Sequence, residues 1–202
     1  MTVTAGVVGV QGDVSEHATA IERAGERCGR EVSVVEIRDA GLVPECDVLL
    51  LPGGESTTIS RLVHRKGIAP ELEAHVGADK PLLATCAGLI LVSAAANDPR
   101  VETLDLLDVT VERNAFGRQR ESFEAALEVA GLADPFPAVF IRAPVIDTVG
   151  DGVEVLAEWD GNPVAVRQGS VVATAFHPEL THDARLHHLA CFDGVPSDVS
   201  TP

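Results

Sequence analysis

Three short apolar runs, followed by Gln11-Gly12, by Pro52-Gly53 and by Cys86-Ala87, constrain the fold of this chain most. The runs are Val3–Val10, Cys46–Leu51 and Leu82–Thr85. Runs that are apolar throughout are typical of strands buried on both faces, as in a parallel sheet. Between the first two runs, Val14–Arg27 spaces its apolar residues as a helix does. We therefore predict an α/β fold: a three-layer, flavodoxin-like, open and mostly parallel sheet with added antiparallel strands.

Further elements follow along the chain, and their character changes from about residue 104. The additional predicted elements are a strand at Glu31–Ile37, helices at Gly88–Ala96 and Ala184–Phe192, and short strands at Val109–Glu112, Val139–Ile141, Val153–Trp159, Val164–Arg167 and Val171–Thr174. Hairpin-type turns at Asp160-Gly161-Asn162 and Gln168-Gly169-Ser170 join the last three strands. These strands either extend the sheet as antiparallel members or fold over its edge. Because no linker divides the chain, we predict one domain at 1–193 and a polar tail at 194–202.

The chain of 202 residues is strongly acidic, with 31 Asp and Glu against 15 Lys and Arg and a formal net charge of −16. Such a surface repels phosphate backbones, so we do not expect nucleic-acid binding. The simplest interpretation is a well-solvated surface. The sharper hypothesis is halophilic adaptation, because concentrated salt screens the mutual repulsion of the carboxylates.

Membrane insertion and export are not expected either. Hydrophobic residues make up 46% of the chain, but no apolar stretch reaches about 18 residues, and no basic segment precedes the first run. The cysteines form no Cys-x-x-Cys pair, so neither a zinc site nor a disulfide framework is indicated. These features favour a cytoplasmic protein without a metal ion.

Small and polar residues at the ends of the predicted parallel strands indicate a ligand site. Gln11 follows the first apolar run, Gly53-Gly54-Glu55 follows the second, and Cys86 follows the third. In open α/β sheets, ligands bind beyond the C-terminal ends of the strands. We therefore expect these residues to share one site.

Cys86 stands between a predicted strand and a predicted helix, among the small residues Ala84, Ala87 and Gly88. A sharp turn there would present the sulfur at the sheet edge, with free helix N–H groups aimed at the atom it attacks. A helix N-terminus also favours a thiolate over a thiol. The alternative is a structural cysteine beside the helix start, since free cysteine is commonly buried.

A nucleophilic cysteine needs a base, and His177 follows another apolar strand. An imidazole can take the thiol proton and return it to a leaving amine, while Glu179 orients the ring. Taken singly, a histidine such as His177 is more often a surface or capping residue, and an acid such as Glu179 is more often a solvated charge at a helix start. We interpret the other histidines as surface residues and assign them no function: His17, His64, His75, His182, His187 and His188. The remaining cysteines also receive no function: Cys28, Cys46 and Cys191.

Six segments in a fixed order together resemble a known family. They are Gly9-Val10-Gln11-Gly12, Leu51-Pro52-Gly53-Gly54-Glu55-Ser56-Thr57-Thr58, Thr85-Cys86-Ala87-Gly88, Arg113-Asn114-Ala115-Phe116-Gly117-Arg118-Gln119, Phe140-Ile141-Arg142-Ala143-Pro144 and Phe176-His177-Pro178-Glu179. Over about residues 3–192 the chain is similar to the glutaminase subunits of pyridoxal 5′-phosphate synthase, which are triad-type (class I) glutamine amidotransferases. The Cys and His-x-Glu parts are shared by all triad glutaminases. The second and fourth segments are more particular to this subunit.

The resemblance implies hydrolysis of L-glutamine to glutamate and ammonia through a glutamyl thioester, with no cofactor. Cys86 would be the nucleophile, His177 the proton carrier and Glu179 the residue that orients it. Backbone N–H groups at Gly54 and Ala87 would hold the oxyanion. The positions that match the family's glutamine contacts are Gly54, Glu55, Ser56, Arg113, Ile141 and Arg142. Either arginine suits a carboxylate, which a guanidinium grips with two hydrogen bonds.

The resemblance also implies a partner. A (β/α)8-barrel synthase subunit, in a large hetero-oligomer, would receive the ammonia, and Gln11 lies where the family meets that partner. Two alternatives remain: a triad glutaminase serving another biosynthetic partner, and a non-catalytic regulatory protein of flavodoxin-like fold. The segment Arg113–Gln119 argues against the first. The joint presence of the three triad residues argues against the second.

Overall fold

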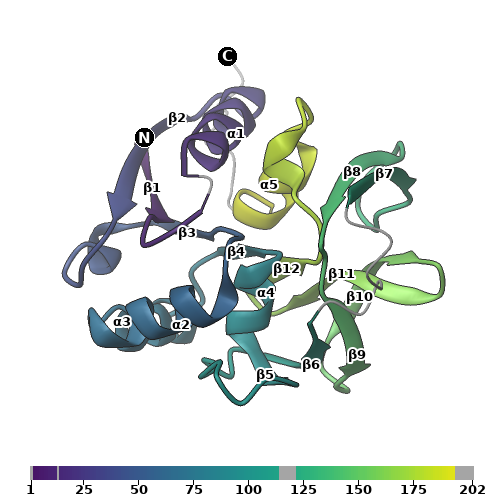
Figure 1. Ribbon diagram of the computed structural model, residues 1–202. Helices are drawn as coiled ribbons and strands as arrows, with labels where there is room; N and C mark the ends of the chain where they lie inside the picture. The colour runs from purple at the N-terminus through teal and green to yellow at the C-terminus, as the bar shows by residue number, and fades with distance from the viewer. Residues whose placement is uncertain (1, 13, 114–121, 194–202) are drawn as a thin grey trace.

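A seven-stranded sheet forms the centre of the computed structural model, which describes residues 2–12, 14–113 and 122–193 (Figure 1). From one edge to the other its strands are β10 (Glu154–Trp159), β11 (Asn162–Gln168), β12 (Val171–Thr174), β4 (Leu82–Thr85), β3 (Val48–Leu51), β1 (Thr2–Val8) and β2 (Glu31–Ile37). The five strands from β2 to β12 run parallel, and β11 and β10 continue the sheet antiparallel. The order β2-β1-β3-β4-β12 is flavodoxin-like, so the predicted fold class is confirmed.

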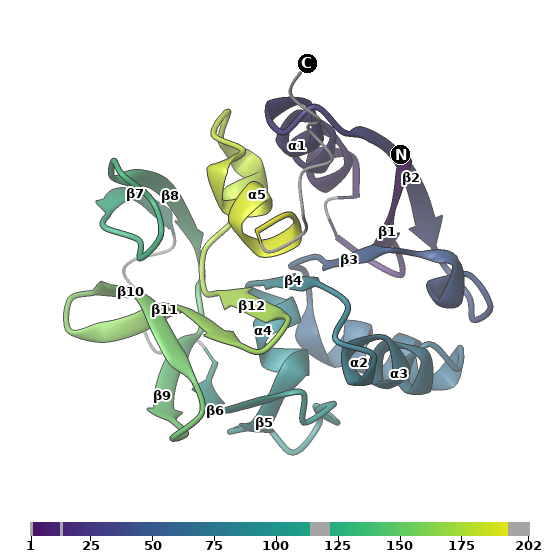
Figure 2. The same cartoon turned by 180° about the vertical axis from the view of Figure 1, so that it is seen from behind.

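Helices cover both faces of this sheet and complete the three predicted layers. α1 (Val14–Arg27) and α5 (Arg185–Cys191) lie on one face (Figures 1 and 2). α2 (Ser56–Arg65), α3 (Ala69–Gly77) and α4 (Ala87–Val92) lie on the other. Two short 3-10 turns, η1 (Val43–Glu45) and η2 (Pro178–Leu180), follow β2 and β12. All residues of β3 and β4 are buried, because helices cover both of their faces.

Two small sheets stand beside the main one. β5 (Ser93–Ala96), β6 (Leu107–Glu112) and β9 (Val145–Val149) form one of them, and β7 (Ser122–Leu127) and β8 (Phe136–Ile141) form the other. Among the later strands, β10 and β11 extend the main sheet antiparallel, as one of the two predicted arrangements has it, and β6 and β8 belong to separate sheets. The prediction is wrong for β12, which joins the main sheet in parallel beside β4. His177 N–H donates to the Val139 carbonyl oxygen at 2.8 Å, which ties the loop after β12 to β8.

The predicted helix Gly88–Ala96 is wrong in its second half. The helix ends at Val92, and Ser93–Ala96 pairs in parallel with β6. The buried Ser93 hydroxyl donates to the Ile90 carbonyl oxygen at 2.8 Å and ends the helix there. Strand pairing thus overrides the helix preference of the alanines. The sequence pattern also assigned no element to residues 69–77, which form α3.

The predicted tail at 194–202 lies outside the described residues, as do residues 114–119 of the Arg113–Gln119 segment. None of the helices in the described part of the chain is both long and apolar enough to cross a membrane.

Candidate active site

Cys86 sits on a strained turn between β4 and α4. Its backbone has φ 50° and ψ −104°, a left-handed conformation that is costly for a residue with a side chain. The Cys86 N–H donates to the Thr174 carbonyl oxygen of β12 at 2.8 Å, which fixes the turn to the neighbouring strand. The side chain is 8% exposed. The sulfur therefore stands at the C-terminal edge of the sheet, as the sequence predicted.

Two glycines make room for this turn. A Cβ added to Gly88 would lie 2.2 Å from the Leu51 carbonyl oxygen, so α4 can approach β3 this closely because position 88 has no side chain. A Cβ added to Gly53 would lie 2.6 Å from His177 Cε1 and 3.2 Å from Cys86 Cβ. Gly53 therefore lies against both groups, and the cysteine and histidine face the same small space.

His177 and Glu179 form a buried pair at the end of β12. His177 Nδ1 lies 2.6 Å from Glu179 Oε1, and the two residues are 6% and 5% exposed. Burial lowers the pKa of His177, but hydrogen bonds and charge interactions with Cys86 and Glu179 outweigh it and raise that pKa to about 10. Burial raises the pKa of Glu179, but the charges of His17 and His177 and the bond to His177 bring it below its ordinary value. The carboxylate thus stays ionised beside a protonated imidazole.

A cavity of about 390 Å³ opens beside these groups. It is lined by Gln11, Gly54, Glu55, Ser56, Cys86, Ala87, Ile90, Arg113, Ile141, Arg142, Pro144 and His177. Every residue predicted from the sequence lines it except Glu179, which lies behind His177, and Gly53, which packs against His177 and Cys86. Ile90 and Pro144 add apolar wall that the sequence analysis did not assign. One end of the cavity is therefore a thiol and imidazole, and the other carries charged side chains.

Glu55 joins the loop after β3 to the start of α2. Its carboxylate caps that helix by accepting from the Thr57 and Thr58 N–H groups at 3.4 and 2.8 Å. Hydrogen bonds from Thr57 and Thr58 lower the pKa of Glu55 to about 2, against the opposing effect of burial. The Glu55 N–H donates to Gln11 Oε1 at 3.2 Å, which links the ends of β1 and β3.

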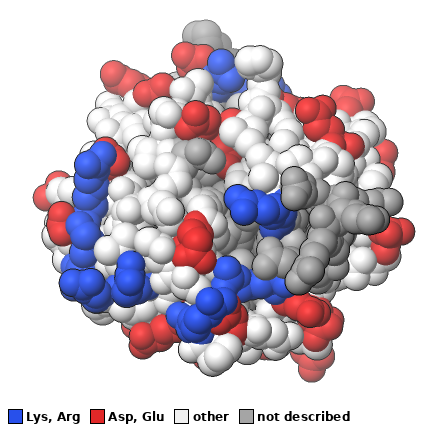
Figure 3. Space-filling view, viewed as in Figure 1, with Lys and Arg blue, Asp and Glu red and all other residues white. Residues whose placement is uncertain are grey.

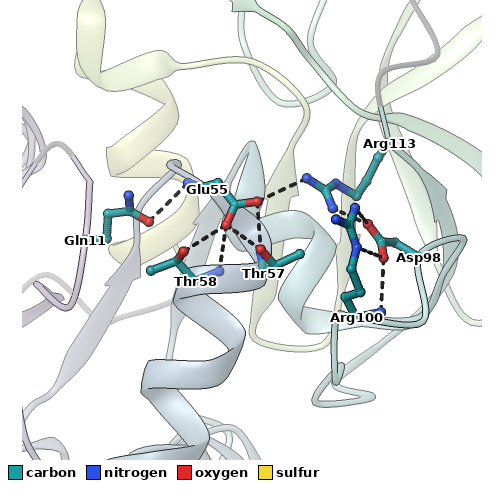
Figure 4. Close-up of polar contacts among 7 residues, drawn as sticks. All are labelled: Gln11, Glu55, Thr57, Thr58, Asp98, Arg100 and Arg113. Atoms are coloured by element: carbon teal, nitrogen blue, oxygen red, sulfur yellow. Dashed lines mark hydrogen bonds and ion pairs between the residues drawn. The ribbon is translucent and has the colours of Figure 1, made fainter.

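Arg113 reaches the cavity through a chain of ion pairs (Figure 4). Its guanidinium contacts Glu55 Oε1 at 3.2 Å and pairs with Asp98 on its other side. Arg100 grips the same Asp98 with Nε and Nη2 at 2.9 and 2.7 Å. Bonds from Arg100 and Arg113 hold the pKa of Asp98 well below its usual range. The sequence analysis missed Asp98, because an acid before a proline resembles an ordinary loop residue.

Ile141 and Arg142 approach from the end of β8. The Cys86 Sγ lies 4.0 Å from the Ile141 carbonyl oxygen. Arg142 is exposed and has φ 44°, a strained backbone conformation. Strain of this kind is common at functional positions, where a side chain must be held in one place. Basic side chains gather on the left and lower part of the face in Figure 3, while Asp and Glu dominate its rim. At the cavity itself, Arg113 and Arg142 are the lining residues that favour an anionic group.

The prediction that the remaining histidines lie at the surface is wrong for three of them. His17 and His187 are 0% exposed and His75 is 4% exposed. His75 Nε2 lies 3.1 Å from the Pro81 carbonyl oxygen, whereas His17 and His187 lie beside the triad. Sequence periodicity on α1 marks position 17 as inward-facing, since Ile21 and Ala24 share its face. That signal was available and was not used.

Among the described residues, no group of three His, Cys, Asp or Glu side chains converges as a metal site requires. The arrangement can instead perform nucleophilic chemistry on an acyl group: a thiol, an imidazole within reach of it, and a carboxylate that fixes the ring. Helix N–H groups at Ala87 can receive developing negative charge.

Comparisons with known proteins agree with this geometry. A family model described as the SNO glutamine amidotransferase family matches residues 7–192. The pyridoxal 5′-phosphate synthase subunit PdxT of Halobacterium salinarum is 72% identical over 98% of this chain and 97% of that protein. The subunit of the same name from Haloarcula marismortui is 70% identical over 98% of this chain and 100% of that protein. Both relatives come from haloarchaea, which supports the halophilic hypothesis.

A solved structure described as a glutamine amidotransferase superposes with a TM-score of 0.82 and 46% sequence identity, covering 92% of this chain and 96% of that chain. The resemblance carried by the six sequence segments is thereby confirmed. The chain belongs to the SNO glutamine amidotransferase family.

Proposed function

We propose that this chain is the glutaminase subunit of a pyridoxal 5′-phosphate synthase and hydrolyses L-glutamine to L-glutamate and ammonia. The observation that carries the proposal is the meeting of Cys86, His177 and Glu179 at one edge of the sheet, beside a cavity of about 390 Å³. Family membership and the identity of 72% to a PdxT subunit support both the reaction and its pathway.

The triad divides the reaction into two acyl transfers. With its proton already held on His177, the Cys86 sulfur bonds to the amide carbon of the glutamine side chain, and the amide oxygen becomes the oxyanion. The oxyanion collapses, the C–N bond breaks, and His177 donates its proton to the leaving nitrogen, so ammonia departs and a thioester remains. Water then attacks the thioester, His177 takes a proton from it, and the sulfur leaves as glutamate forms. A pKa near 10 suits His177 to hold a proton between these transfers.

Substrate binding falls to the charged end of the cavity. Arg113 and Arg142 suit the α-carboxylate of glutamine, and the ionised Glu55 suits its α-ammonium group. Ser56 and Ile141 complete the wall beside them. The N–H groups of Ala87 and Gly54 would hold the oxyanion, and losing one such donor costs a factor of about 10² to 10³ in turnover.

The test is ammonia release from L-glutamine, measured for the wild type and for Cys86→Ala with a barrel synthase subunit present. We expect the substitution to lower release by about 10⁴-fold or more. Cys28→Ala is the matched control, because the Cys28 thiol, just after α1, donates to the Gly25 carbonyl oxygen in the last turn of that helix at 3.2 Å, away from the cavity. Equal release from the wild type and Cys86→Ala would remove this residue from the mechanism.

We also propose that a (β/α)8-barrel synthase subunit receives the ammonia and docks near Gln11. The names of the relatives, which are synthase subunits, support such a partner. The hydrogen bond from Glu55 N–H to Gln11 Oε1 connects Gln11 to the loop that carries Gly54, so a protein that moves Gln11 on docking also moves this loop. Release measured with and without the barrel subunit checks this step. Equal ammonia release with and without the barrel subunit would favour another biosynthetic partner. Residence in the cytoplasm stays a prediction.

A further inference from the structure

Two buried histidines lie behind the triad, on the side of Glu179 that His177 does not use. His17 belongs to α1 and His187 to α5, and both are 0% exposed. Glu179 contacts His177 Nδ1 through Oε1 at 2.6 Å, while its Oε2 lies 3.5 Å from His17 Nε2. The carboxylate is therefore held between two imidazole rings, one from each side.

The His17 ring is fixed through both of its nitrogens. Nε2 lies 3.2 Å from Thr85 Oγ1, and Thr85 is the residue that precedes Cys86. Nδ1 lies 3.4 Å from His187 Nε2 on α5. These two contacts come from β4, which leads into Cys86, and from α5, which follows His177 and Glu179 in the chain. The position of His17 therefore depends on the elements next to the triad residues.

The charges decide what the ring can do there. An ionised carboxylate can only accept, so the His17 ring stabilises Glu179 Oε2 through an N–H on the facing nitrogen or through its own positive charge. Burial, aided by the neighbouring His17, lowers the pKa of His187 to about 3, so that ring is neutral. The buried Oε2 has no hydrogen-bond partner among the described residues, so the His17 ring at 3.5 Å is the group that stabilises its negative charge. Without that ring, a buried carboxylate tends to take up a proton or turn away from its remaining partner.

We propose that His17 is a positioning residue for the triad: from α1 it holds Glu179 Oε2, so that Oε1 stays ionised and aimed at His177 Nδ1. The inference rests on the proposed function of the triad. His17 does not line the substrate cavity, so its effect on the reaction passes through the carboxylate of Glu179.

The first test compares His17→Leu with the wild type in the complex with the barrel synthase. We expect kcat to fall by about 10- to 100-fold, with the KM for glutamine within about twofold. His17→Gln, which keeps an N–H donor, should recover most of the loss. The matched control is His75→Leu, another buried histidine, whose ring contacts Pro81 away from the site.

The pH profile separates this role from a structural one. The titratable groups that face Glu179 in the described part of the chain are His177 after β12, His17 on α1 and His187 on α5, while Cys86 faces His177. His17 lowers the pKa of Glu179, so removing His17 raises that pKa. When the pH is lowered, Glu179 in His17→Leu therefore takes up its proton earlier, and activity is lost at a higher pH than in the wild type. An acid limb in His17→Leu that coincides with the wild type would overturn the proposal.

A double-mutant cycle and a spectrum complete the test. In a Glu179→Gln background, His17→Leu should lower kcat by no more than about twofold, and losses that simply multiply would contradict the proposal. In the chain alone, the low-field NMR proton on His177 Nδ1, identified by its absence from His177→Gln, should shift in His17→Leu but not in His75→Leu. An unmoved signal would also overturn it. Because this signal needs no turnover, a wild type without glutaminase activity would refute the proposed function separately.

Discussion

Replacing Gly53 by alanine tests how closely His177 must be aligned with Cys86. A Cβ at position 53 would lie 2.6 Å from His177 Cε1 and 3.2 Å from Cys86 Cβ. The Gly53 backbone lies outside the left-handed region, so alanine can adopt it, and the added methyl acts through its contacts. The substitution therefore changes the spacing between His177 and Cys86 but keeps both the imidazole and the thiol.

The structure sets the size of the effect. To restore an ordinary contact of 3.4 Å, the imidazole must retreat by about 0.8 Å. The bond of 2.6 Å between Nδ1 and Glu179 resists this movement. A misplacement of about 1 Å in a catalytic group typically costs about 10²-fold, so we expect kcat to fall by about 10- to 100-fold. Overpacking of this kind lowers the free energy of unfolding by about 1–3 kcal/mol.

The assay is single-turnover thioester formation with the barrel subunit bound, together with thermal unfolding of each variant. Gly77→Ala is the matched control, because a Cβ there meets nothing within 4 Å. That control should keep wild-type turnover and gain about 0.5–1 kcal/mol of stability. A Gly53→Ala variant with wild-type kcat, or with a change confined to KM, would refute the argument that these two groups need this spacing.

Two further predictions follow from the charges. Asp98→Asn removes the carboxylate that Arg113 shares with Arg100, so the guanidinium loses its alignment beside Glu55, and the KM for glutamine should rise about tenfold with kcat within about twofold. Steady-state kinetics check this against Asp105→Asn, an exposed acid in the same connection, and an equal KM in both variants would contradict it. The net charge of −16 predicts that the free energy of unfolding rises from low to molar potassium chloride, as salt screens repulsion between carboxylates. Urea titrations at each salt concentration measure it, and destabilisation by salt would contradict halophilic adaptation.

The helices and strands could be predicted well where the apolar periodicity of a segment indicated only one type of element. The bounds Val14–Arg27, Glu31–Ile37, Leu82–Thr85 and Val171–Thr174 agree with the structure, because apolar periodicity over a single element reports its own burial. The alanines at 94–96 misled the prediction, since their helix preference is weaker than the pairing of β5 with β6. The strand order could be predicted as a class, but the separate sheets containing β6 and β8 depend on contacts between distant segments.

The candidate site divides in the same way. Cys86, His177 and Glu55 could be named in advance, because two of them follow directly on apolar strands or their turns and the histidine stands two residues before a carboxylate, which are all local patterns. Asp98 and His17 could not be assigned their roles. Asp98 pairs with Arg113 from a loop 15 residues away, and His17 contacts Glu179 from a helix at the other end of the chain.

The sequence by itself determined that this chain builds an open, mostly parallel sheet and presents a cysteine at the end of one strand. Those properties follow from short-range periodicity and from the steric freedom of small residues around position 86. Tertiary structure alone decided which titratable side chains lose contact with water, and so which of them act together. The reason is that the burial and pairing of a charge depend on groups brought together from α1, β4, β12 and α5. The spacing of residues along the chain does not predict contacts between such distant segments.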